Sequence, residues 1–431
     1  MEQRDVASGS GTLGRRAILG AAATGAVLAG ARRARAQTPV TLSMAVWASQ
    51  AEEAAFNAAI AAYQKLHPEV TVRLEVSGSG PQFFQQIDTR LAGRMAPDLF
   101  RVQYQQVGRY SSARAIVDLG KYVDAAYLAD FGPAFVQAVT FKDRLYAMPH
   151  HTDTFAVDTN TDMMRKLGVT PPASLDKSWS WQQFIQVARD LKAKAGAPYG
   201  FAMSWQNAAY RWLPFLYQHG GQLLNADLTQ SQLATPQGIE TIAWTQSWFK
   251  EGLVPPSTSI KSGEQPQNLF ANGTVGMLLG GDWQIPFLAK NMQAEWSVTY
   301  MPRDVAMASD LGGNCLAVTR DCKHPEIAAD FLKFVADKDH MRDFVTGAQF
   351  LPVRKSLMAE QLPYKLRPEA MKVFVEQAAT IPPHLVGTVT LPNFSKINAT
   401  LGDQLDLAFT SGQDPAATAK AIDEQVRAVL A

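Results

Sequence analysis

The sequence predicts an α/β protein with two domains. From residue 40 onward, strand-like and helix-like segments alternate in the order strand, helix, strand, helix, strand, which is typical of a parallel sheet. The chain has 431 residues, more than a single hydrophobic core usually serves, so a second domain is expected. The boundary between two such domains is a common place for a ligand cleft.

The first 36 residues are expected to be an export signal rather than part of the fold. Arg15 and Arg16 precede a weakly apolar run at 17–31, and small residues at 34–36 suit a cleavage site. Fifteen residues of helix extend about 22 Å, less than the ~30 Å of a hydrocarbon core, so a permanent anchor is not expected. Residues 13–19 resemble a twin-arginine signal, with an ordinary secretory signal as the alternative. Either signal predicts a periplasmic protein in a Gram-negative bacterium.

Charge and cysteine content exclude several classes of protein. The chain has 40 basic and 39 acidic side chains, of which six and two lie in the first 36 residues. The remaining 395 residues therefore carry 34 basic and 37 acidic side chains, which provides no basic field for nucleic acid. Cys315 and Cys322 are the only cysteines, so a disulfide scaffold is excluded, and the two can pair with each other or remain buried thiols.

The first region shows the strand and helix periods in turn. Apolar residues alternate over 40–46 and again over 70–76, as in half-buried strands. Between them lies a segment with helical spacing, and Ser49 with Glu52 forms the S-x-x-E pattern of a helix start. A further helix precedes a third strand at 98–102, which completes the predicted parallel arrangement.

A second region of this kind begins near Leu145. Ser180 and Gln183 repeat the helix-start pattern before a helix that carries Trp181 and Phe184 on one face. Later strands are predicted at 275–279, 298–301 and 315–318. Pro325 opens a helix, and the C-terminal third is expected to be mainly helical. No long flexible linker follows residue 37, so the domains are expected to be joined by short crossovers.

Short motifs occur in a fixed order along most of the chain. They are residues 55–68, APDL at 96–99, LYAMP at 145–149 followed by Asn160, QHGG at 218–221, residues 270–286, Gly312-Gly313, and LPVRKS at 351–356. Their order and spacing resemble the extracellular solute-binding proteins that supply carbohydrates to ATP-driven importers, the family of the maltodextrin- and glycerol-phosphate-binding proteins. The resemblance covers residues 38–431.

The resemblance implies a fold and a function. The fold is the two-lobed periplasmic-binding-protein fold of type II, with crossovers near 149–156, 301–305 and 350–354. The implied lobes are residues 37–150 with 303–352, and 151–302 with 353–431. The implied function is capture of a mono- or oligosaccharide by a monomer without cofactor, and its delivery to ABC-type permease subunits. A polyol or a glycerol-phosphate-like solute is the alternative ligand.

Aromatic and acidic residues are the first candidates for a sugar site, since rings cover C–H faces and carboxylates bind hydroxyls. Trp283, after the strand at 275–279, matches a cleft tryptophan of relatives. Asp282 beside it either accepts hydroxyls or caps the following helix. Asp153 matches a cleft acid of relatives, and Tyr210 a second stacking residue. Trp205 is a weaker candidate, and the nearby Trp212 is expected in the core.

Strand ends supply further candidates, because α/β sheets bind ligands beyond the carboxyl ends of their strands. Trp47 and Ser49 end the first strand, although Ser49 alternatively serves only as a helix cap. Gln103, Tyr104 and Gln105 follow the third strand, where several relatives have an acid and this chain has an amide. This difference argues against copying a relative's ligand onto the chain.

The last candidates are a glycine-rich segment, an arginine near the third crossover and a His–Asp pair near the first. Gly312 and Gly313 allow close backbone approach to a ligand, and Asn314 offers both donor and acceptor; a tight turn is the alternative reason for the glycines. Arg354 either binds an anionic group or pairs with a structural acid. His151 with Asp153 is also a candidate pair, but it lacks further ligands at metal-site spacing, so no metal is expected.

An exported glycoside hydrolase is the main enzyme alternative. It needs two carboxylates about 5–10 Å apart, and the sequence leaves Asp153 with Asp282 open as such a pair. Against it, the chain has no G-x-S-x-G, H-E-x-x-H, Walker or strand-linked G-x-G-x-x-G motif. We therefore expect a binding protein and no enzyme.

Overall fold

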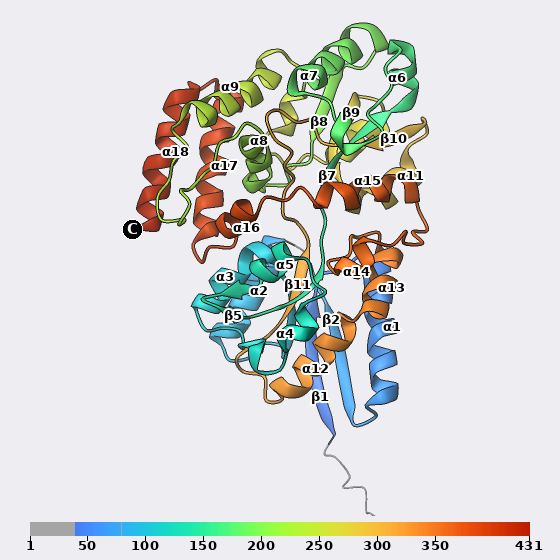
Figure 1. The fold of residues 1–431 in the computed structure, drawn as a ribbon, viewed down its shortest axis with the longest axis vertical. Helices are drawn as coiled ribbons and strands as arrows, with labels where there is room; N and C mark the ends of the chain where they lie inside the picture. Colours follow the sequence, from blue (N-terminus) through green and yellow to red (C-terminus); the bar gives the residue numbers. More distant parts are fainter. Residues whose placement is uncertain (1–38, 79) are drawn as a thin grey trace, which may run out of the picture. The chain divides into compact units, whose positions relative to one another are not determined.

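Two β-sheets form the centre of a computed structural model that describes residues 39–78 and 80–431 (Figure 1). Both sheets belong to one unit, Pro39–Ala431. The export signal predicted for residues 1–36 lies outside the described residues. None of the described helices is both long and apolar enough to cross a membrane.

The first sheet has five strands in the order β2-β1-β3-β11-β6. They are β1 (Val40–Val46), β2 (Val70–Val76), β3 (Leu99–Gln103), β6 (Met148–His151) and β11 (Asn314–Val318). β1 pairs in parallel with β2 and β3, as predicted. β11 runs antiparallel to β3 and to β6, so the sheet is mixed. A strand that returns through a covering helix would run parallel to its neighbour, whereas the chain reaches β11 from the second sheet.

Helix starts in this region follow the predicted capping chemistry. Ser49 accepts a hydrogen bond from the Glu52 amide at 3.3 Å, and the Glu52 carboxylate accepts one from the Ser49 amide at 2.7 Å. Two backbone donors at the start of α1 are thereby satisfied. The helices that pack on this sheet are α1 (Gln50–Leu66), α3 (Tyr104–Ser112), α12 (Pro325–Val335) and α13 (Lys338–Ala348).

The second sheet has the strand order β10-β7-β9-β8. Its strands are β7 (Phe155–Asn160), β8 (Tyr199–Met203), β9 (Val275–Gly281) and β10 (Trp296–Thr299). β7 is antiparallel to both its neighbours, and β8 is parallel to β9. β10 lies two residues earlier than the strand predicted at 298–301. The sheet packs against α6 (Thr161–Leu167), α7 (Trp181–Asp190), α10 (Pro266–Ala271) and α15 (Pro368–Ala378).

The C-terminal part is mainly helical, as predicted. After α15 come α16 (Pro383–Val389), α17 (Phe394–Ser411) and α18 (Pro415–Leu430). The last two pack against each other and against α9 (Pro236–Lys250), and Figure 1 shows the three side by side. α17 also contacts α3, and α16 contacts α5 (Pro133–Ala138), so these helices touch elements of the first sheet's region.

Backbone bonds show where the chain passes from one sheet to the other. β6 ends at His151 and β7 begins at Phe155, so the first passage is residues 152–154. Residues 303–308 bond to the region of the second sheet. Arg303 exchanges backbone bonds with Trp179 and Trp181, and the carbonyl of Ala308 accepts a bond from Gln218. The second passage is therefore residues 309–313, because β11 begins at Asn314.

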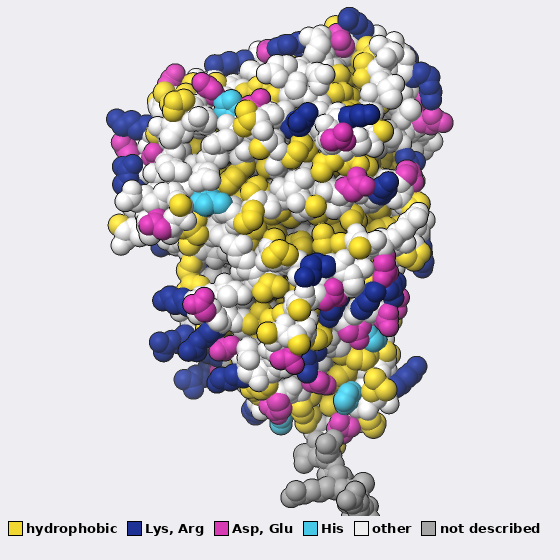
Figure 2. Space-filling view, in the orientation of Figure 1, with side chains coloured by type: hydrophobic (Ala, Val, Ile, Leu, Met, Phe, Trp, Pro, Cys, Tyr) yellow, Lys and Arg dark blue, Asp and Glu magenta, His cyan; other side chains and the backbone are white. Residues whose placement is uncertain are grey.

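Both cysteines are buried and free. The Cys315 thiol donates to the carbonyl of Val102 at 3.3 Å, within the first sheet. Of the two alternatives left by the sequence, the structure has the free thiols. On the surface, Figure 2 shows acidic and basic side chains interspersed over the face drawn.

Candidate ligand-binding site

Three aspartates meet at the first passage between the sheets. Asp153 lies in this passage. The Asp282 carboxylate accepts a hydrogen bond from the Thr154 amide at 3.0 Å, and the Asp310 carboxylate accepts one from the Phe155 amide at 3.2 Å. Asp282 follows β9, and Asp310 lies in the second passage, so three distant segments converge here. Asp282 and Asp310 are fully buried, and Asp153 is half-buried.

Burial makes these carboxylates harder to ionise. It raises the pKa of Asp153 to about 7, helped by the charge of Asp310 and opposed by Arg211, Arg101 and the Gly313 amide. It raises the pKa of Asp310 to about 6, against the attraction of Arg211. Burial, together with the charge of Asp153, raises the pKa of Asp282 well above its ordinary value. Burial thus favours the protonated form of all three carboxyl groups, and the nearby guanidinium groups offset it only in part.

Several buried polar atoms of this group have no hydrogen-bond partner within the described residues. They are Oδ2 of Asp282, Oδ2 of Asp310 and Nε of Arg211. A buried polar atom left without a partner costs about 1–3 kcal/mol, and most such atoms in folded proteins are satisfied. The two carboxylate oxygens and the guanidinium nitrogen therefore have unused hydrogen-bonding capacity.

Arg211 lies among aromatic rings. Its guanidinium is 4.8 Å from the ring centroid of Trp283, 5.1 Å from that of Phe155 and 5.9 Å from that of Tyr210. One of its nitrogens donates to the carbonyl of Ser204 at 2.6 Å. The guanidinium is thus fixed by the backbone and by cation–π contacts, which makes it a rigid part of the group.

Trp283 and Tyr210 are half-buried and border the same guanidinium. The Trp283 ring packs on the backbone of Gly281 so closely that a Cβ there would lie 1.8 Å from a ring carbon. The Tyr210 amide donates to the side chain of Asn398 at 2.8 Å, which fixes its turn to α17. The Trp283 ring and the Tyr210 backbone are therefore held in place, and both residues keep part of their surface accessible.

Glycines let the second passage approach Asp153. A Cβ on Gly312 would lie 1.8 Å from Oδ1 of Asp153, so the carboxylate occupies the place of a side chain. Gly313 has a φ of +87°, and a Cβ there would lie 2.4 Å from Cα of Thr152. Both glycines are thus needed for contact between the first and second passages.

A second polar cluster lies behind Trp47. Arg101, which is buried in β3, forms an ion pair with Glu52 at 2.6 Å and donates to the carbonyl of Trp47 at 2.6 Å. Its guanidinium is 4.6 Å from the centroid of the half-buried Trp47 ring. Another of its nitrogens lies 3.0 Å from Nε2 of His151. Burial and the charge of Arg101 lower the pKa of His151 far below its ordinary value, so this ring is neutral and internal.

The residues predicted after β3 connect the two clusters. Gln103 is half-buried and pairs with Asn314 in the ladder between β3 and β11. The buried Tyr104 hydroxyl donates to the carbonyl of His151 at 3.2 Å. The buried Gln105 amide donates to the carbonyl of Leu311 in the second passage. The side-chain amide of Asn314 lies 3.1 Å from Nε2 of His151.

Three predicted site residues are occupied elsewhere. Arg354 pairs with Asp130 at 3.1 Å and donates to the carbonyl of Ala336 at 2.7 Å, which fits its structural alternative. Trp205 is buried, with its ring 6.1 Å from that of Phe409. Ser49 is exposed and serves as the helix cap described above. Trp212 is fully buried, as expected.

Sequence reasoning assigned no binding role to Arg211 or Asp310. Arg211 follows the predicted site residue Tyr210 in the same short helical turn, and this position next to a candidate was the sequence signal that could have indicated a role in the site. Asp310 lies two residues before Gly312 in a segment without periodicity, so nothing in the local pattern distinguished it. Among the described residues outside masked positions, no three His, Cys, Asp or Glu side chains are arranged to hold a metal ion.

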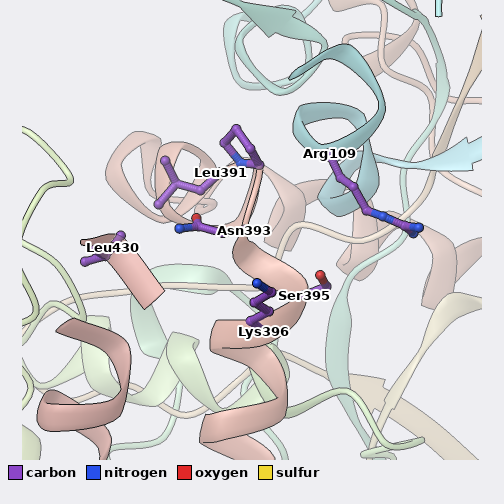
Figure 3. Close-up of a pocket in the computed structure, with 7 residues that line it drawn as sticks. Arg109, Leu391, Asn393, Ser395, Lys396 and Leu430 are labelled. Atoms are coloured by element: carbon purple, nitrogen blue, oxygen red, sulfur yellow. The ribbon is translucent and has the colours of Figure 1, made fainter. Parts of the chain in front are cut away.

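A separate hollow of about 460 Å³ lies between α3 and the segment that joins α16 to α17 (Figure 3). It is lined by Arg109, Leu391, Pro392, Asn393, Ser395, Lys396 and Leu430. Arg109 is held by an ion pair with Asp88. None of the candidate site residues predicted from the sequence lines this hollow.

The chain resembles known solute-binding proteins in sequence and fold. The family described as bacterial extracellular solute-binding protein matches residues 47–342. The maltodextrin-binding protein MdxE of Bacillus subtilis is 21% identical over 312 residues, which are 70% of each chain. The GacH receptor of Streptomyces glaucescens, solved unliganded and with acarbose, has a TM-score of 0.77 at 21% identity, covering 91% of this chain and 99% of the receptor.

An ABC substrate-binding protein of Listeria monocytogenes, solved with cycloalternan, has a TM-score of 0.78 at 19% identity, covering 90% of this chain and 98% of that protein. These likenesses confirm the predicted α/β periplasmic-binding-protein fold. The family match spans well over half of the sequence. This chain therefore belongs to the bacterial extracellular solute-binding proteins.

Proposed function

We propose that the protein captures a saccharide at the group formed by Asp153, Asp282, Asp310, Arg211 and the rings of Tyr210 and Trp283, and delivers it unchanged to an ABC-type permease. The observation that carries this proposal is the juxtaposition of two anchored, half-exposed rings with buried, unpartnered carboxylate oxygens. Rings cover the C–H faces of a sugar, and carboxylates accept hydrogen bonds from its hydroxyls.

The relatives support this kind of ligand. MdxE is named for maltodextrin, another relative in Streptomyces coelicolor is a diacetylchitobiose binding protein, and the Listeria protein was solved with cycloalternan. A polyol remains the second candidate ligand, since a solute-binding protein of Agrobacterium radiobacter was solved with ribitol at a TM-score of 0.74. A phosphorylated solute fits the group poorly, because the group consists mainly of acidic side chains, with Arg211 as the nearby cation.

The proposal includes export to the periplasm and function as a binding protein without catalysis. In support, Asp282, one member of the carboxylate pair that a glycosidase would need, is fully buried and accepts the Thr154 amide. A hydrolase needs both carboxyls beside the scissile bond. Asp282 is better suited to hold the first passage in place.

We also propose that closure of two lobes traps the ligand. In this scheme the lobes exchange the chain at residues 152–154, 309–313 and 357–367, because the backbone of 355–356 still bonds to Asp130 while α15 packs on the second sheet. The hydroxyls of Thr154 and Ser309 bond to each other where the first two passages lie side by side. Hinge closure needs such short segments between packed elements.

A thermal-shift screen of the purified protein tests the proposed function. The panel contains neutral mono- and oligosaccharides, amino sugars, polyols and glycerol phosphate. A ligand present at 1,000 times its Kd adds about 4 kcal/mol to the free energy of unfolding. We expect at least one saccharide to stabilise the protein, and small-angle X-ray scattering to show a smaller radius of gyration with it. Stabilisation by none of the saccharides, or turnover of a glycoside, would contradict the proposal.

A further inference from the structure

The charges around the candidate site do not balance. The largest charge effects on Asp153, Asp282 and Asp310 come from one another, from Arg211 and from Arg101. Arg101 is already neutralised by Glu52, at 2.6 Å. Among the described residues, these three carboxyl groups, two fully buried and one half-buried, therefore have Arg211 as the nearby cation that no carboxylate already pairs. Buried charges in proteins are normally paired, so this group lacks positive charge.

The geometry shows where further positive charge would be placed. Oδ1 of Asp282 accepts the Thr154 amide and Oδ1 of Asp310 accepts the Phe155 amide at the start of β7, whereas both Oδ2 atoms are buried and have no partner within the described residues. Asp153 lies beside both residues, because its chain neighbour Thr154 contacts both carboxylates. The Arg211 guanidinium is bound to Ser204 and packed on the rings.

The two accessible rings favour the same kind of group. Trp283 and Tyr210 already have the Arg211 guanidinium 4.8 and 5.9 Å from their ring centroids, and the π-surface that remains accessible can contact a further cation or the C–H face of a sugar. A neutral hydroxyl satisfies one carboxylate oxygen at a time, whereas an ammonium group has three donors and a charge. An anionic sugar acid would instead bring further negative charge to a group of acidic side chains.

We propose that the ligand is a cationic saccharide, an amino sugar or an oligosaccharide with a free amine, whose ammonium group lies against Asp153 and the unpartnered oxygens of Asp282 and Asp310. The inference rests on the proposed function, since it specifies the saccharide for the same site. It assigns recognition of charge to the carboxylates and recognition of the sugar face to Trp283 and Tyr210.

Isothermal titration calorimetry at pH 7 with matched sugar pairs tests this inference. Glucosamine, galactosamine and mannosamine are compared with glucose, galactose and mannose, and the fully deacetylated chitobiose with its diacetyl form. We expect the aminated member of at least one pair to bind at least tenfold tighter than its neutral partner. Its binding should also release protons, because a nearby cation lowers the pKa of Asp153 from about 7.

Variants test whether the carboxyl groups cause the preference for aminated sugars. Asp153→Asn and Asp310→Asn should each reduce the ratio of amine to neutral affinity at least fivefold. Asp143→Asn is the matched control, because Asp143 is exposed in a turn with a φ of +60° that Asn also adopts. It should keep the wild-type ratio. The wild-type comparison alone decides the inference if a site variant does not fold.

The possible outcomes separate the two proposals. Equal or tighter binding of the neutral members in every pair that binds overturns the cationic ligand and leaves the saccharide-binding function intact. An amine preference that survives both site variants also overturns it. Absence of binding by every saccharide, charged or neutral, contradicts the proposed function itself.

Discussion

Replacing Asp310 with Asn should remove a pH dependence from the stability of the ligand-free protein. Asp310 is fully buried, and burial raises the pKa of its carboxyl from 3.8 to about 6. The folded protein therefore retains this proton to a higher pH than the unfolded chain does. Its contribution to the free energy of unfolding is present below pH 4 and is lost as pH rises to about 6.

The expected magnitude follows from this difference in pKa. A difference between 3.8 and about 6 corresponds to a loss of about 3 kcal/mol once the pH exceeds both values. Asn retains an oxygen that can accept the Phe155 amide and the Thr154 hydroxyl, and it carries no charge to desolvate. Asp310→Asn should thus be more stable than wild type at pH 8 by up to about 3 kcal/mol, and similar to it at pH 4.

Urea unfolding followed by circular dichroism at pH 4, 6 and 8 measures this effect, with Asp143→Asn as the control for loss of an exposed carboxylate. The control should follow the wild-type profile at all three pH values. If Asp310→Asn also runs parallel to wild type between pH 4 and 8, then Asp310 is not a destabilised buried carboxylate and our description of the group is wrong.

Three further substitutions separate binding from folding. Trp283→Ala should raise the Kd of the ligand at least tenfold with an unchanged circular dichroism spectrum, because it removes a half-exposed stacking face; an unchanged Kd would place the ring in the core. Gly281→Ala should weaken binding to a similar extent, because the added Cβ would displace the Trp283 ring. The backbone φ of −114° at this position accepts Ala without strain, so the effect should come from the ring alone. Titration calorimetry would measure the change in Kd. Arg354→Ala should lower the free energy of unfolding by about 2 kcal/mol through loss of its bond to Ala336 and its pair with Asp130, while the Kd stays the same; a changed Kd would return Arg354 to the site.

Local signals in the sequence predicted the elements well. The alternation over 40–46 and 70–76 gave parallel strands, and the S-x-x-E and S-x-x-Q patterns at Ser49 and Ser180 gave capping boxes. Such features depend on residues within a few positions of each other, so they are legible without tertiary structure. The antiparallel direction of β11 could not be predicted in this way, because it depends on the route of the chain between the two sheets.

The candidate site was only partly predictable for the same reason. Aromatic and acidic residues at strand ends, such as Trp283 and Asp153, fit a general rule of α/β sheets. Asp310 joins them through a bond to Phe155, which is 155 positions away in the sequence. The sequence left Arg354 two interpretations, an anionic ligand or a structural acid, and its guanidinium pairs with Asp130.

A crystal structure of the protein with a saccharide selected by the calorimetric screen tests the central claim most directly. We predict that a C–H face of the sugar packs on Trp283 or Tyr210, and that a donor of the ligand, an ammonium group if the further inference holds, lies within hydrogen-bond distance of Asp153. Density for the saccharide only in the hollow lined by Arg109 and Lys396, or at another place away from the three carboxylates, would contradict the account.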